Sequence, residues 1–479
     1  MHRFYKYLYA IPLVLALVGC KAPMPTIIKD EVKENVPKNF ENQENDFTQN
    51  IGTTPWKQFF TDAQLQKLIE IALANNQELM KTYQEIEIAK SNVLYKKGML
   101  SPTVNAGGSI GVKKAGRYTS EGAGDANTNM EGNKPIPDPL MNFEGGLNAS
   151  WEIDIWKKLR NEKDAAVAHY LSTVEGKNFI LSSLIAEIAN NYYELLSLDN
   201  QLDIIHQYIK INERALEIAK IQKEAAATTE LAVKKFEAEL AKSKAEEYNV
   251  KQDIAEKENI INALLGRFPQ PIERTKDNFI SIIPQNVYVG IPSQLLENRP
   301  DIRAAEFELK SAKLDVEAAR KEFYPSVGIS ATLGLEAFKP NYLVKLPESV
   351  AYNLAGEIAG PLINKSAIKA NFKTADARQI EALYEYDKTI INSYLEVSNL
   401  MSKIKNLDQY YTLKSQETKA LEQSIDIATL LFKNSRADYL EVLMNNRDLL
   451  DAKMELVEAK KNQLGTVVNI YKSLGGGWK

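Results

Sequence analysis

Four segments of the chain alternate strictly between apolar and polar residues, and each is about ten residues long. They lie at 103–113, 142–152, 326–338 and 349–359. A period of two places successive side chains on opposite faces of a β-strand, and about ten residues is the length of a tilted strand that crosses a bilayer. The pattern predicts four transmembrane strands, although a two-sided sheet in a soluble domain has the same period.

Two long tracts without proline predict very long helices. Residues 157–223 and 365–433 are rich in Ala, Leu, Glu, Lys and Ile, and a helix of about 67 residues is about 100 Å long. Each tract ends in a short polar break, at 225–229 and at 434–438. After each break a second helix is expected, because apolar residues recur there at intervals of three and four, which is typical of coiled-coil packing.

The two halves of the chain repeat each other. Positions in the first half match positions 223 residues further on (302 minus 79), in the pairs Leu79 and Ile302, Ala89 and Ala312, Val93 and Val316, Pro102 and Pro325, and Val104 and Val327. A first repeat at 56–290 and a second at 291–479 each contain a helix, two strands, a long helix, a break and a helix. The loop between the first two strands is expected to be the longer one. The chain is therefore predicted to be an internal duplication of whole supersecondary units.

The N-terminus has the features of an exported lipoprotein. Residues 1–19 have the layout of a signal peptide, with Arg3 and Lys6 before an apolar run. The run ends just before Cys20, an arrangement similar to the lipobox of bacterial lipoproteins, whose cysteine is acylated. A free cysteine after an ordinary signal peptide is the alternative. Residues 20–55, rich in Pro, Lys, Glu and Asn, are predicted to form a mostly extended tether.

Composition and charge exclude several other classes of protein. The formal net charge of -4 argues against a nucleic-acid partner. One cysteine and three histidines cannot build a cysteine-rich zinc site or a disulfide framework. Gly176-Lys177-Asn178 lacks the other residues of a phosphate loop, and neither His169 nor His206 has a second ligand four residues on. We therefore expect no enzymatic activity, no cofactor and no metal site.

The predicted elements together indicate a conduit. No other apolar run approaches 18 residues, so a membrane crossing must use strands. Four strands cannot close a barrel, since the smallest bacterial barrels have eight, and open strand edges are not tolerated in lipid. Several chains must therefore share one barrel, which the long helices would continue as a helical tube outside the membrane.

Motifs along nearly the whole chain from Cys20 resemble those of one family. They are the lipobox, Trp56, Asp62-Ala63-Gln64-Leu65, Ile71-Ala72-Leu73-Ala74-Asn75-Asn76, Trp151-Glu152-Ile153-Asp154-Ile155-Trp156, Arg299-Pro300-Asp301-Ile302-Arg303-Ala304-Ala305-Glu306, Phe323-Tyr324-Pro325-Ser326 and Leu474-Gly475-Gly476-Gly477-Trp478. These motifs are similar to those of the outer membrane factor family, of the TolC and OprM type, in its NodT-like lipoprotein branch. The run that starts at Arg299 and the glycine-rich end are specific signals.

The resemblance implies an α+β fold in which a homotrimer closes one 12-stranded β-barrel and a long α-helical coiled-coil barrel. It implies the outer membrane of a Gram-negative bacterium, a lipid anchor, and an extension through the periplasm. The implied partners are a periplasmic membrane fusion (adaptor) protein and an inner-membrane pump, most often of the RND type. The implied function is that of a passive outer membrane channel in a tripartite efflux or export system, and nothing in the chain names its substrate.

Two alternative functions remain at this stage. A type I protein secretion duct belongs to the same family and shares its architecture. A structural trimeric surface lipoprotein would use its coiled coils as a stalk. A stalk predicts one continuous heptad run without duplicated pairs of strands, which disagrees with the pattern of this chain.

The resemblance also implies the position of a periplasmic gate near the second break. Phe432 stands where many members of the family have a constricting Tyr, Arg436 resembles an arginine that latches neighbouring helices, and Glu441 resembles an acid that rings the closed end. Met444 departs from the family, which usually has a second acid there. The alternative is that Arg436 and Glu441 are ordinary solvated charges, since an exposed ion pair contributes about 0–1 kcal/mol.

The same resemblance places adaptor docking at the two helix breaks. The residues implied are Ala227, Thr228, Thr229, Asn434 and Ser435. Neither break contains glycine, which departs from the common tip motif of the family.

Overall fold

The computed structural model describes residues 22–27, 31–40, 49–130, 132–275, 279–282, 284, 287–361, 365–434 and 436–479. The predicted signal peptide, Cys20 and Ser435 lie outside these described residues. The contacts between residues divide the chain into two compact units. Unit 1 comprises residues 1–29, 87–171 and 307–383, and unit 2 comprises residues 30–86, 172–306 and 384–479. Within the described ranges, no helix combines the length and the apolar character needed to cross a membrane.

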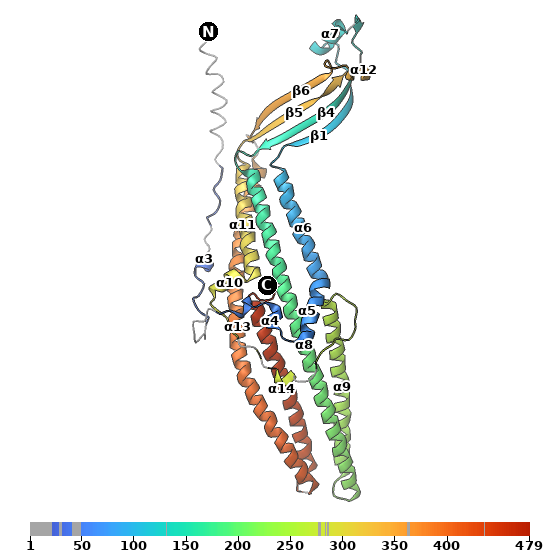
Figure 1. The fold of residues 1–479 in the computed structure, drawn as a ribbon, viewed down its shortest axis with the longest axis vertical. Helices are drawn as coiled ribbons and strands as arrows, with labels where there is room; N and C mark the ends of the chain where they lie inside the picture. Colours follow the sequence, from blue (N-terminus) through green and yellow to red (C-terminus); the bar gives the residue numbers. More distant parts are fainter. Residues whose placement is uncertain are drawn as a thin grey trace. The chain divides into compact units, whose positions relative to one another are not determined.

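Unit 1 contains a four-stranded antiparallel sheet with the strand order β1-β4-β5-β6 (Figure 1). The strands are β1 (Thr103–Lys113), β4 (Leu140–Ile153), β5 (Ser326–Ala337) and β6 (Val350–Ala359). They occupy the four segments that alternate with period two. β4 from the first half of the chain pairs with β5 from the second half. The two halves therefore build one continuous sheet.

The strand register sorts apolar and polar side chains onto opposite faces of this sheet. Leu147 lies opposite Leu333, which in turn lies opposite Tyr352. The next row contains Asn148 opposite Thr332, and this row lies on the other face because successive side chains alternate. Leu333 and Tyr352 are exposed in the single chain. An uncovered apolar face opposite a polar face is the arrangement expected of a strand set that contacts lipid on one side and water on the other.

A row of glycines crosses the polar face. Gly107 lies opposite Gly146, and Gly146 lies opposite Gly334. A Cβ atom added to Gly146 would lie 2.4 Å from the Cα of Gly334, so only glycine permits this close approach of the strands. The row forms the floor of a groove of about 520 Å³, which Glu144 and Glu336 also line.

The two loops at the far ends of the strand pairs differ in length. The loop from β1 to β4 contains the short helix α7 (Ser120–Asn127) and the strands β2 (Asn129–Met130) and β3 (Lys134–Pro135). The loop from β5 to β6 contains only α12 (Pro340–Leu343) among its described residues. The longer loop is thus partly structured, with Thr119 capping the start of α7.

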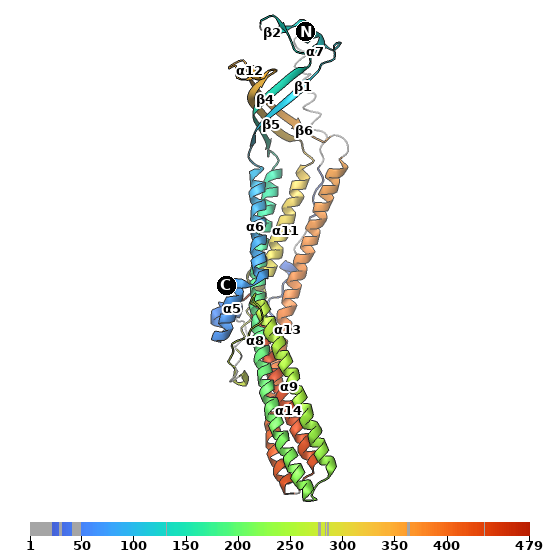
Figure 2. The same ribbon diagram turned by 90° about the vertical axis from the view of Figure 1, so that its right-hand side faces the viewer.

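The long helices pair into two hairpins. α8 (Lys158–Glu224) is followed by α9 (Glu230–Leu264), and α13 (Ser366–Lys433) is followed by α14 (Tyr439–Ser473). Their lengths of 67, 35, 68 and 35 residues show the duplication directly. In unit 2 the turns of both hairpins lie at the same end (Figure 2).

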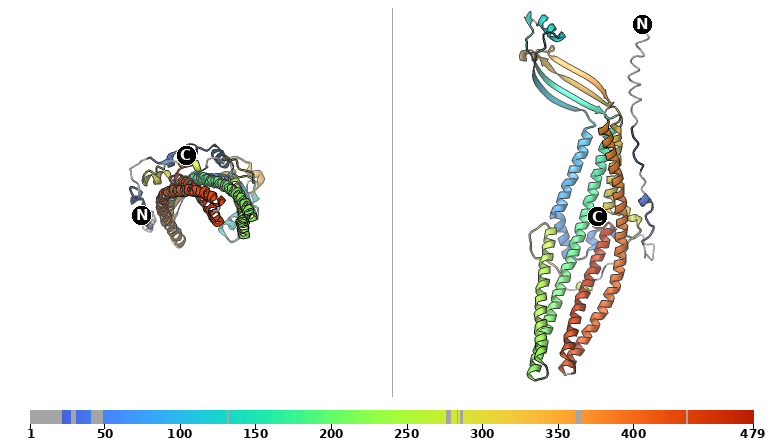
Figure 3. Two further views of the ribbon diagram at one scale, coloured as in Figure 1. Left: turned by 90° about the horizontal axis from the view of Figure 1, so that it is seen from below. Right: turned by 180° about the vertical axis from the view of Figure 1, so that it is seen from behind.

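Side-chain packing fixes the order of the helices in unit 2 as α9, α8, α14, α13. Phe236 of α9 packs on Ala219 of α8, with Tyr439 of α14 against them. α14 is joined to α13 by the hydroxyl of Thr418, which donates to the backbone oxygen of Ala452 at 3.4 Å. Seen from below, these helices follow an arc (Figure 3). Their exposed surfaces are mixed, with apolar side chains such as Leu413, Ile427 and Leu430 of α13 among the polar ones.

The main hydrophobic core lies in unit 2 where short helices cover the long ones. The short helices are α4 (Trp56–Phe59), α5 (Ala63–Asn75) and α10 (Ser293–Asn298), with the 3-10 helices η1 (Ile51–Thr53) and η2 (Phe279–Ser281). The Asp62 side chain caps α5 by accepting from the backbone of Gln64 and Leu65. Phe59 stacks on Tyr471 of α14 with 3.9 Å between ring centroids. Two more helices, α6 (Gln77–Gly98) and α11 (Pro300–Lys321), have residues in both units, as do α8 and α13.

The described part of the tether is bound to the helices. The backbone nitrogen and the hydroxyl of Thr26 donate to the Asp376 carboxylate at 2.8 and 2.6 Å, and Ala22 packs in a cluster with Phe372. Further along, α3 (Glu31–Glu34) forms a single helical turn. Residues 22–27 form neither helix nor strand, and the mostly extended tether stays a prediction, with Thr26 bound to Asp376 of α13 and Lys33 paired with Glu306 of α11 at 2.6 Å.

Candidate functional site

The turn between α8 and α9, the first tip, is closed by its own backbone. Ala226 has a positive φ of 54°, and the backbone nitrogen of Ala227 donates to the oxygen of Gln222 at 2.8 Å while that of Ala226 donates to the oxygen of Lys223 at 3.0 Å. This pair of bonds is a Schellman motif, in which glycine usually holds the left-handed position. Ala226 therefore occupies a backbone conformation that is unfavourable for a residue with a side chain.

Side chains reinforce the first tip. The Thr229 hydroxyl caps α9 by accepting from the backbone nitrogen of Ala232. Lys223, in the last turn of α8, forms an ion pair with Glu230, in the first turn of α9. The hydrogen bond from Lys223 lowers the pKa of the Glu230 carboxyl. The ion pair thus joins the two helix ends, while the cap and the backbone motif fix the start of α9 and the end of α8.

In the turn between α13 and α14, the second tip, the described residues make neither the side-chain cap nor the ion pair seen at the first tip. The backbone nitrogen of Arg436 donates to the oxygen of Leu431 at 2.9 Å. Asp438 occupies the N-cap position of α14, but its side chain makes no capping hydrogen bond. Arg436 and Glu441 are both exposed, and among the described residues neither side chain has an ion-pair partner. The second tip is therefore held mainly by its backbone and by the packing behind it.

That packing includes Phe432, one of the residues implied by the family resemblance. Phe432 is 6% exposed and packs with Ala428 and Val442, while Ile218 of α8 lies beside them. Its side chain thus fills the interior between α13, α14 and α8 within one chain. Met444, by contrast, is 56% exposed on α14.

The residues implied in adaptor docking are accessible where the structure describes them. Ala227, Thr229 and Asn434 are exposed, and Thr228 is half-buried. The Asn434 amide donates to the backbone oxygen of Leu430 at 2.7 Å. Phe236 and Tyr439 stand edge to face, with ring centroids 6.4 Å apart, and join the two hairpins behind the tips.

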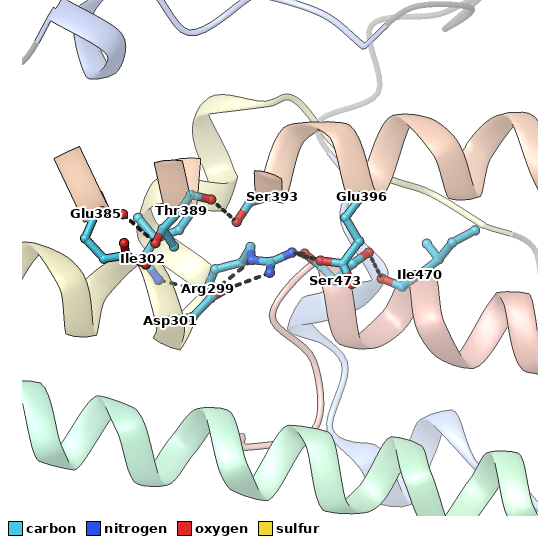
Figure 4. A network of polar contacts seen from close by, with 9 residues as sticks. All are labelled: Arg299, Asp301, Ile302, Glu385, Thr389, Ser393, Glu396, Ile470 and Ser473. Carbon is cyan, nitrogen blue, oxygen red and sulfur yellow. Dashed lines mark hydrogen bonds and ion pairs between the residues drawn. The ribbon is translucent and has the colours of Figure 1, made fainter. Parts of the chain in front are cut away.

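A buried arginine clamps the helices of the second repeat, a role that sequence reasoning did not assign. Arg299 donates through Nε and Nη2 to the Asp301 carboxylate at 3.0 and 2.7 Å (Figure 4). Its Nη1 donates to Glu396 of α13 at 2.8 Å and to the backbone oxygen of Ser473 at 2.7 Å. Burial alone would lower the pKa of Arg299, but the two carboxylates outweigh it and raise the pKa. The Arg-Pro-Asp motif was the available signal, and its partners lie far away in the sequence.

The glycine-rich segment after α14 fits against the same region. Gly475 has a φ of +86°, and a Cβ atom there would lie 2.3 Å from the backbone oxygen of Asn298. The guanidinium of Arg303 lies 6.0 Å from the centre of the Trp478 ring. This segment is specific in sequence because it must pass close to other backbone.

The histidines occupy helix surfaces. His169 pairs with Glu308 at 2.9 Å, and His206 with Glu247 at 3.3 Å. Over the described part of the chain, no group of three or more His, Cys, Asp or Glu side chains is arranged to hold a metal ion.

Comparison with known proteins identifies the class. A family model described as outer membrane efflux protein matches residues 68–267 and 291–476. The chain is 25% identical over 474 residues to the probable outer membrane lipoprotein SilC of Salmonella typhimurium, covering 98% of each chain. It is 24% identical over 471 residues to the cation efflux system protein CusC of Escherichia coli strain K12, covering 97% of this chain and 98% of that one.

Solved structures share the fold. The open state of the Neisseria gonorrhoeae MtrE outer membrane channel matches with a TM-score of 0.81 at 24% identity, covering 96% of this chain and 99% of that one. The Campylobacter jejuni CmeC outer membrane channel matches with a TM-score of 0.79 at 20% identity, covering 96% and 95%.

The chain therefore belongs to the outer membrane efflux protein family. It is an outer membrane channel component of efflux systems. The family resemblance drawn from the motifs is thereby confirmed, as is the outer membrane location.

Proposed function

We propose that three copies of this chain share one 12-stranded barrel and form the passive outer duct of a tripartite export system. The observation that carries the proposal is the sheet of unit 1. It has one apolar face, and in the described residues its edge strands β1 and β6 each pair on one side only. Unpaired edges in lipid are costly, so the edges must pair with those of other copies.

The number of copies follows from barrel size and from the resemblance. Two copies would give the smallest known barrel of eight strands, whose interior is filled by side chains, whereas twelve strands enclose a wider lumen. The resemblance implies three copies. The polar face, with its glycine row and the groove beside Glu144 and Glu336, would line that lumen.

The gate of this duct is proposed at the second tip. The first tip has a cap, an ion pair and a backbone motif, while the second leaves Arg436 and Glu441 exposed. A three-fold axis would gather three copies of each, so Arg436 can pair with Glu441 of a neighbouring copy. Phe432 would act from behind, by fixing the position of α13 against α14.

The remaining parts of the proposal concern partners and anchoring. Both tips, with Ala227, Thr228, Thr229, Asn434 and Ser435, would dock an adaptor protein that connects the duct to an inner-membrane pump. Cys20 would carry the acyl groups. One relative is described as a lipoprotein and another as an efflux pump outer membrane protein. The named relatives are described with cations, pyoverdine or antibiotics, so their names do not converge on one substrate for this chain.

The assembly is tested by cross-linking and light scattering of the detergent-extracted protein. We expect one species with three times the mass of the chain. This species should also retain the strand content of the native protein, as closed strand edges require. A monodisperse monomer with native strand content would contradict barrel sharing. Mass spectrometry of the mature N-terminus tests the anchor separately, and an unmodified Cys20 would exclude it without affecting the barrel.

A further inference from the structure

The helix ends that meet the sheet in unit 1 are unusually basic. We call them the collar, and it comprises residues 94–101, 155–164, 317–325 and 365–373. These residues contain eleven basic side chains (Lys96, Lys97, Lys157, Lys158, Arg160, Lys163, Arg320, Lys321, Lys365, Lys369, Lys373) and four acidic ones (Glu162, Asp164, Glu317, Glu322). Eleven minus four leaves a surplus of seven positive charges. The whole chain carries -4, so the collar is opposite in sign to the rest of the molecule.

Contacts show that the four collar segments are neighbours in space. Lys96 of α6 pairs with Glu162 of α8 at 2.7 Å. Trp156, just before α8, stacks on Tyr324, just after α11, with centroids 5.1 Å apart. Asn371 of α13 donates to Glu322 at 2.8 Å. The charges therefore form one continuous band at the strand ends, not four separate patches.

Part of this charge has no carboxylate partner in the part of the chain that the structure describes. Among the described residues, no carboxylate pairs with the side chains of Lys97, Lys157, Lys365, Lys369 or Lys373. Four of these lysines are exposed, and Lys365 is half-buried. Unpaired cations gathered on one band repel each other, so the fold does not require them for its own stability.

The collar also carries aromatic side chains with exposed rings. Trp156 is 43% exposed, and its indole nitrogen donates to the backbone oxygen of Pro325 at 2.7 Å. Trp151, in β4 beside the collar, is 37% exposed, and its indole nitrogen donates to the backbone oxygen of Leu100 in the collar at 3.1 Å. Amphipathic rings of this kind are enriched where a membrane protein meets the headgroup region.

A cavity of about 270 Å³ lies inside the collar. Trp156, Tyr324, Lys158, Lys321 and Ile368 line it. Its wall also contains three carboxylates, those of Glu152, Asp154 and Glu322. Glu152 pairs with Lys158 at 2.6 Å, and Glu322 accepts from Asn371 at 2.8 Å. The phosphate contacts of the collar are therefore assigned to its exposed lysines without a carboxylate partner, and not to this cavity.

We propose that the collar binds the headgroups of anionic phospholipids in the leaflet where the strands enter the membrane. The inference rests on the proposed function, because the apolar face of the sheet must lie in lipid. An apolar row across β4, β5 and β6, with Ile153 opposite Val327 and Val327 opposite Ile358, lies next to the collar. The apolar face of the sheet, which would contact the lipid tails, therefore ends next to the lysines, which would contact the lipid phosphates. The proposed occupant is a lipid phosphate, because a phospholipid can both pair with the lysines through its phosphate and contact the aromatic rings through its apolar part.

The test compares two variants with the same change of charge. In the collar variant, Lys157, Lys365, Lys369 and Lys373 are each changed to Gln. In the control variant, Lys220, Lys235, Lys242 and Lys403, which are exposed and lie outside the collar, are each changed to Gln. The full-length assembly is mixed with equal amounts of phosphatidylglycerol and phosphatidylcholine, and the retained lipids are counted by native mass spectrometry.

We expect the parent and the control variant to retain phosphatidylglycerol preferentially. In the collar variant, the ratio of retained phosphatidylglycerol to retained phosphatidylcholine should fall at least tenfold. Each lysine near an anionic surface raises the binding constant about fivefold. Changing the same four residues to Arg should preserve it. An unchanged preference in the collar variant, or an equal loss in the control, would overturn the proposal.

Two further arms separate the possible failures. In the first arm, inorganic phosphate is added to the mixture of protein and lipid. Loss of bound phosphatidylglycerol from the parent and the control variant on addition of phosphate would assign the collar to free phosphate and overturn the proposal. Conductance in planar bilayers is measured on the same samples. Conductance without any lipid preference would refute only the collar, whereas failure of the parent to insert into vesicles of either lipid would refute both the membrane-spanning sheet and the collar.

Discussion

The two hairpin tips have the same origin in the duplicated chain but differ in how they are closed. At the first tip, Thr229 caps α9 and Lys223 pairs with Glu230 across the turn. At the second tip, the Asp438 side chain makes no capping hydrogen bond. Arg436 and Glu441 are exposed, and neither forms an ion pair with a described residue of the same chain. The difference teaches that the duplicated tips have diverged: one has a side-chain cap and an ion pair across the turn, and the other exposes two charges that a neighbouring copy would pair in the proposed trimer.

The largest expected effect concerns the aromatic residue behind each tip. Phe236→Ala and Phe432→Ala each remove a buried ring and should cost about 3–5 kcal/mol in the free energy of opening of their own hairpin. Hydrogen exchange of the assembled protein measures this cost. Conductance in planar bilayers should rise for Phe432→Ala only, because the cap and ion pair still close the first tip. Equal conductance in both variants would erase the functional distinction between the tips.

The second prediction removes the charges that face each turn. Arg436→Ala combined with Glu441→Ala should raise single-channel conductance, and Glu441→Ala alone should weaken cation selectivity, because the pairs between copies are lost. The matched control is Lys223→Ala combined with Glu230→Ala, which removes the equivalent charges of the first tip and should leave conductance unchanged. Unaltered conductance and selectivity in the Arg436 and Glu441 variants, with trimers intact, would return these residues to solvated surface charges.

The third comparison concerns the residues at the N-cap positions. Thr229→Ala should lower the local stability of the start of α9 by about 1 kcal/mol, since it removes a hydrogen bond to a free backbone donor. Asp438→Ala should change the start of α14 by only a few tenths of a kcal/mol, because no capping bond exists to be lost. Exchange rates of the first-turn amides report both values. A loss at Asp438 as large as that at Thr229 would show that the second tip is capped after all.

The smallest effect is a dependence on pH at the first tip. The pKa of Glu230 is lowered from its ordinary value of 4.5, chiefly by the hydrogen bond from Lys223. A carboxyl with a lowered pKa stabilises the folded state above the unfolded value and loses this contribution as the pH falls through the folded value. Protection of the amides at 225–229, relative to their intrinsic exchange rate at each pH, should therefore fall below about pH 4.5, and Lys223→Met should abolish that fall. The same fall in the variant would assign it to another group.

The sequence was most informative where a pattern is local. Period two at 103–113 and at 326–338 indicated strands, because successive side chains of a strand point to opposite faces of the sheet. The absence of proline from the long tracts indicated α8 and α13 to within a few residues. Both signals depend only on near neighbours along the chain, and for this reason a single sequence contains them.

Contacts between distant residues were beyond such reasoning. Arg299 contacts Glu396 of α13 and Ser473 of α14 only in the folded chain. No spacing in the sequence predicts these two contacts. Asp376 accepts from Thr26, which is 350 positions away. Phe432 was noted for its place in the family pattern, but the direction of its side chain depends on how α8 lies beside the second hairpin.

The stacking of Phe59 on Tyr471 also imposes an order in time. The Tyr471 hydroxyl donates to the backbone oxygen of Thr54, 417 positions earlier in the chain. A ribosome delivers Trp56, Phe59 and Phe60 long before α14 exists, and closing so large a loop is slow. The core of unit 2 must therefore remain open while most of the chain is made. During that interval, the aromatic residues of this core need a chaperone that shields them from aggregation.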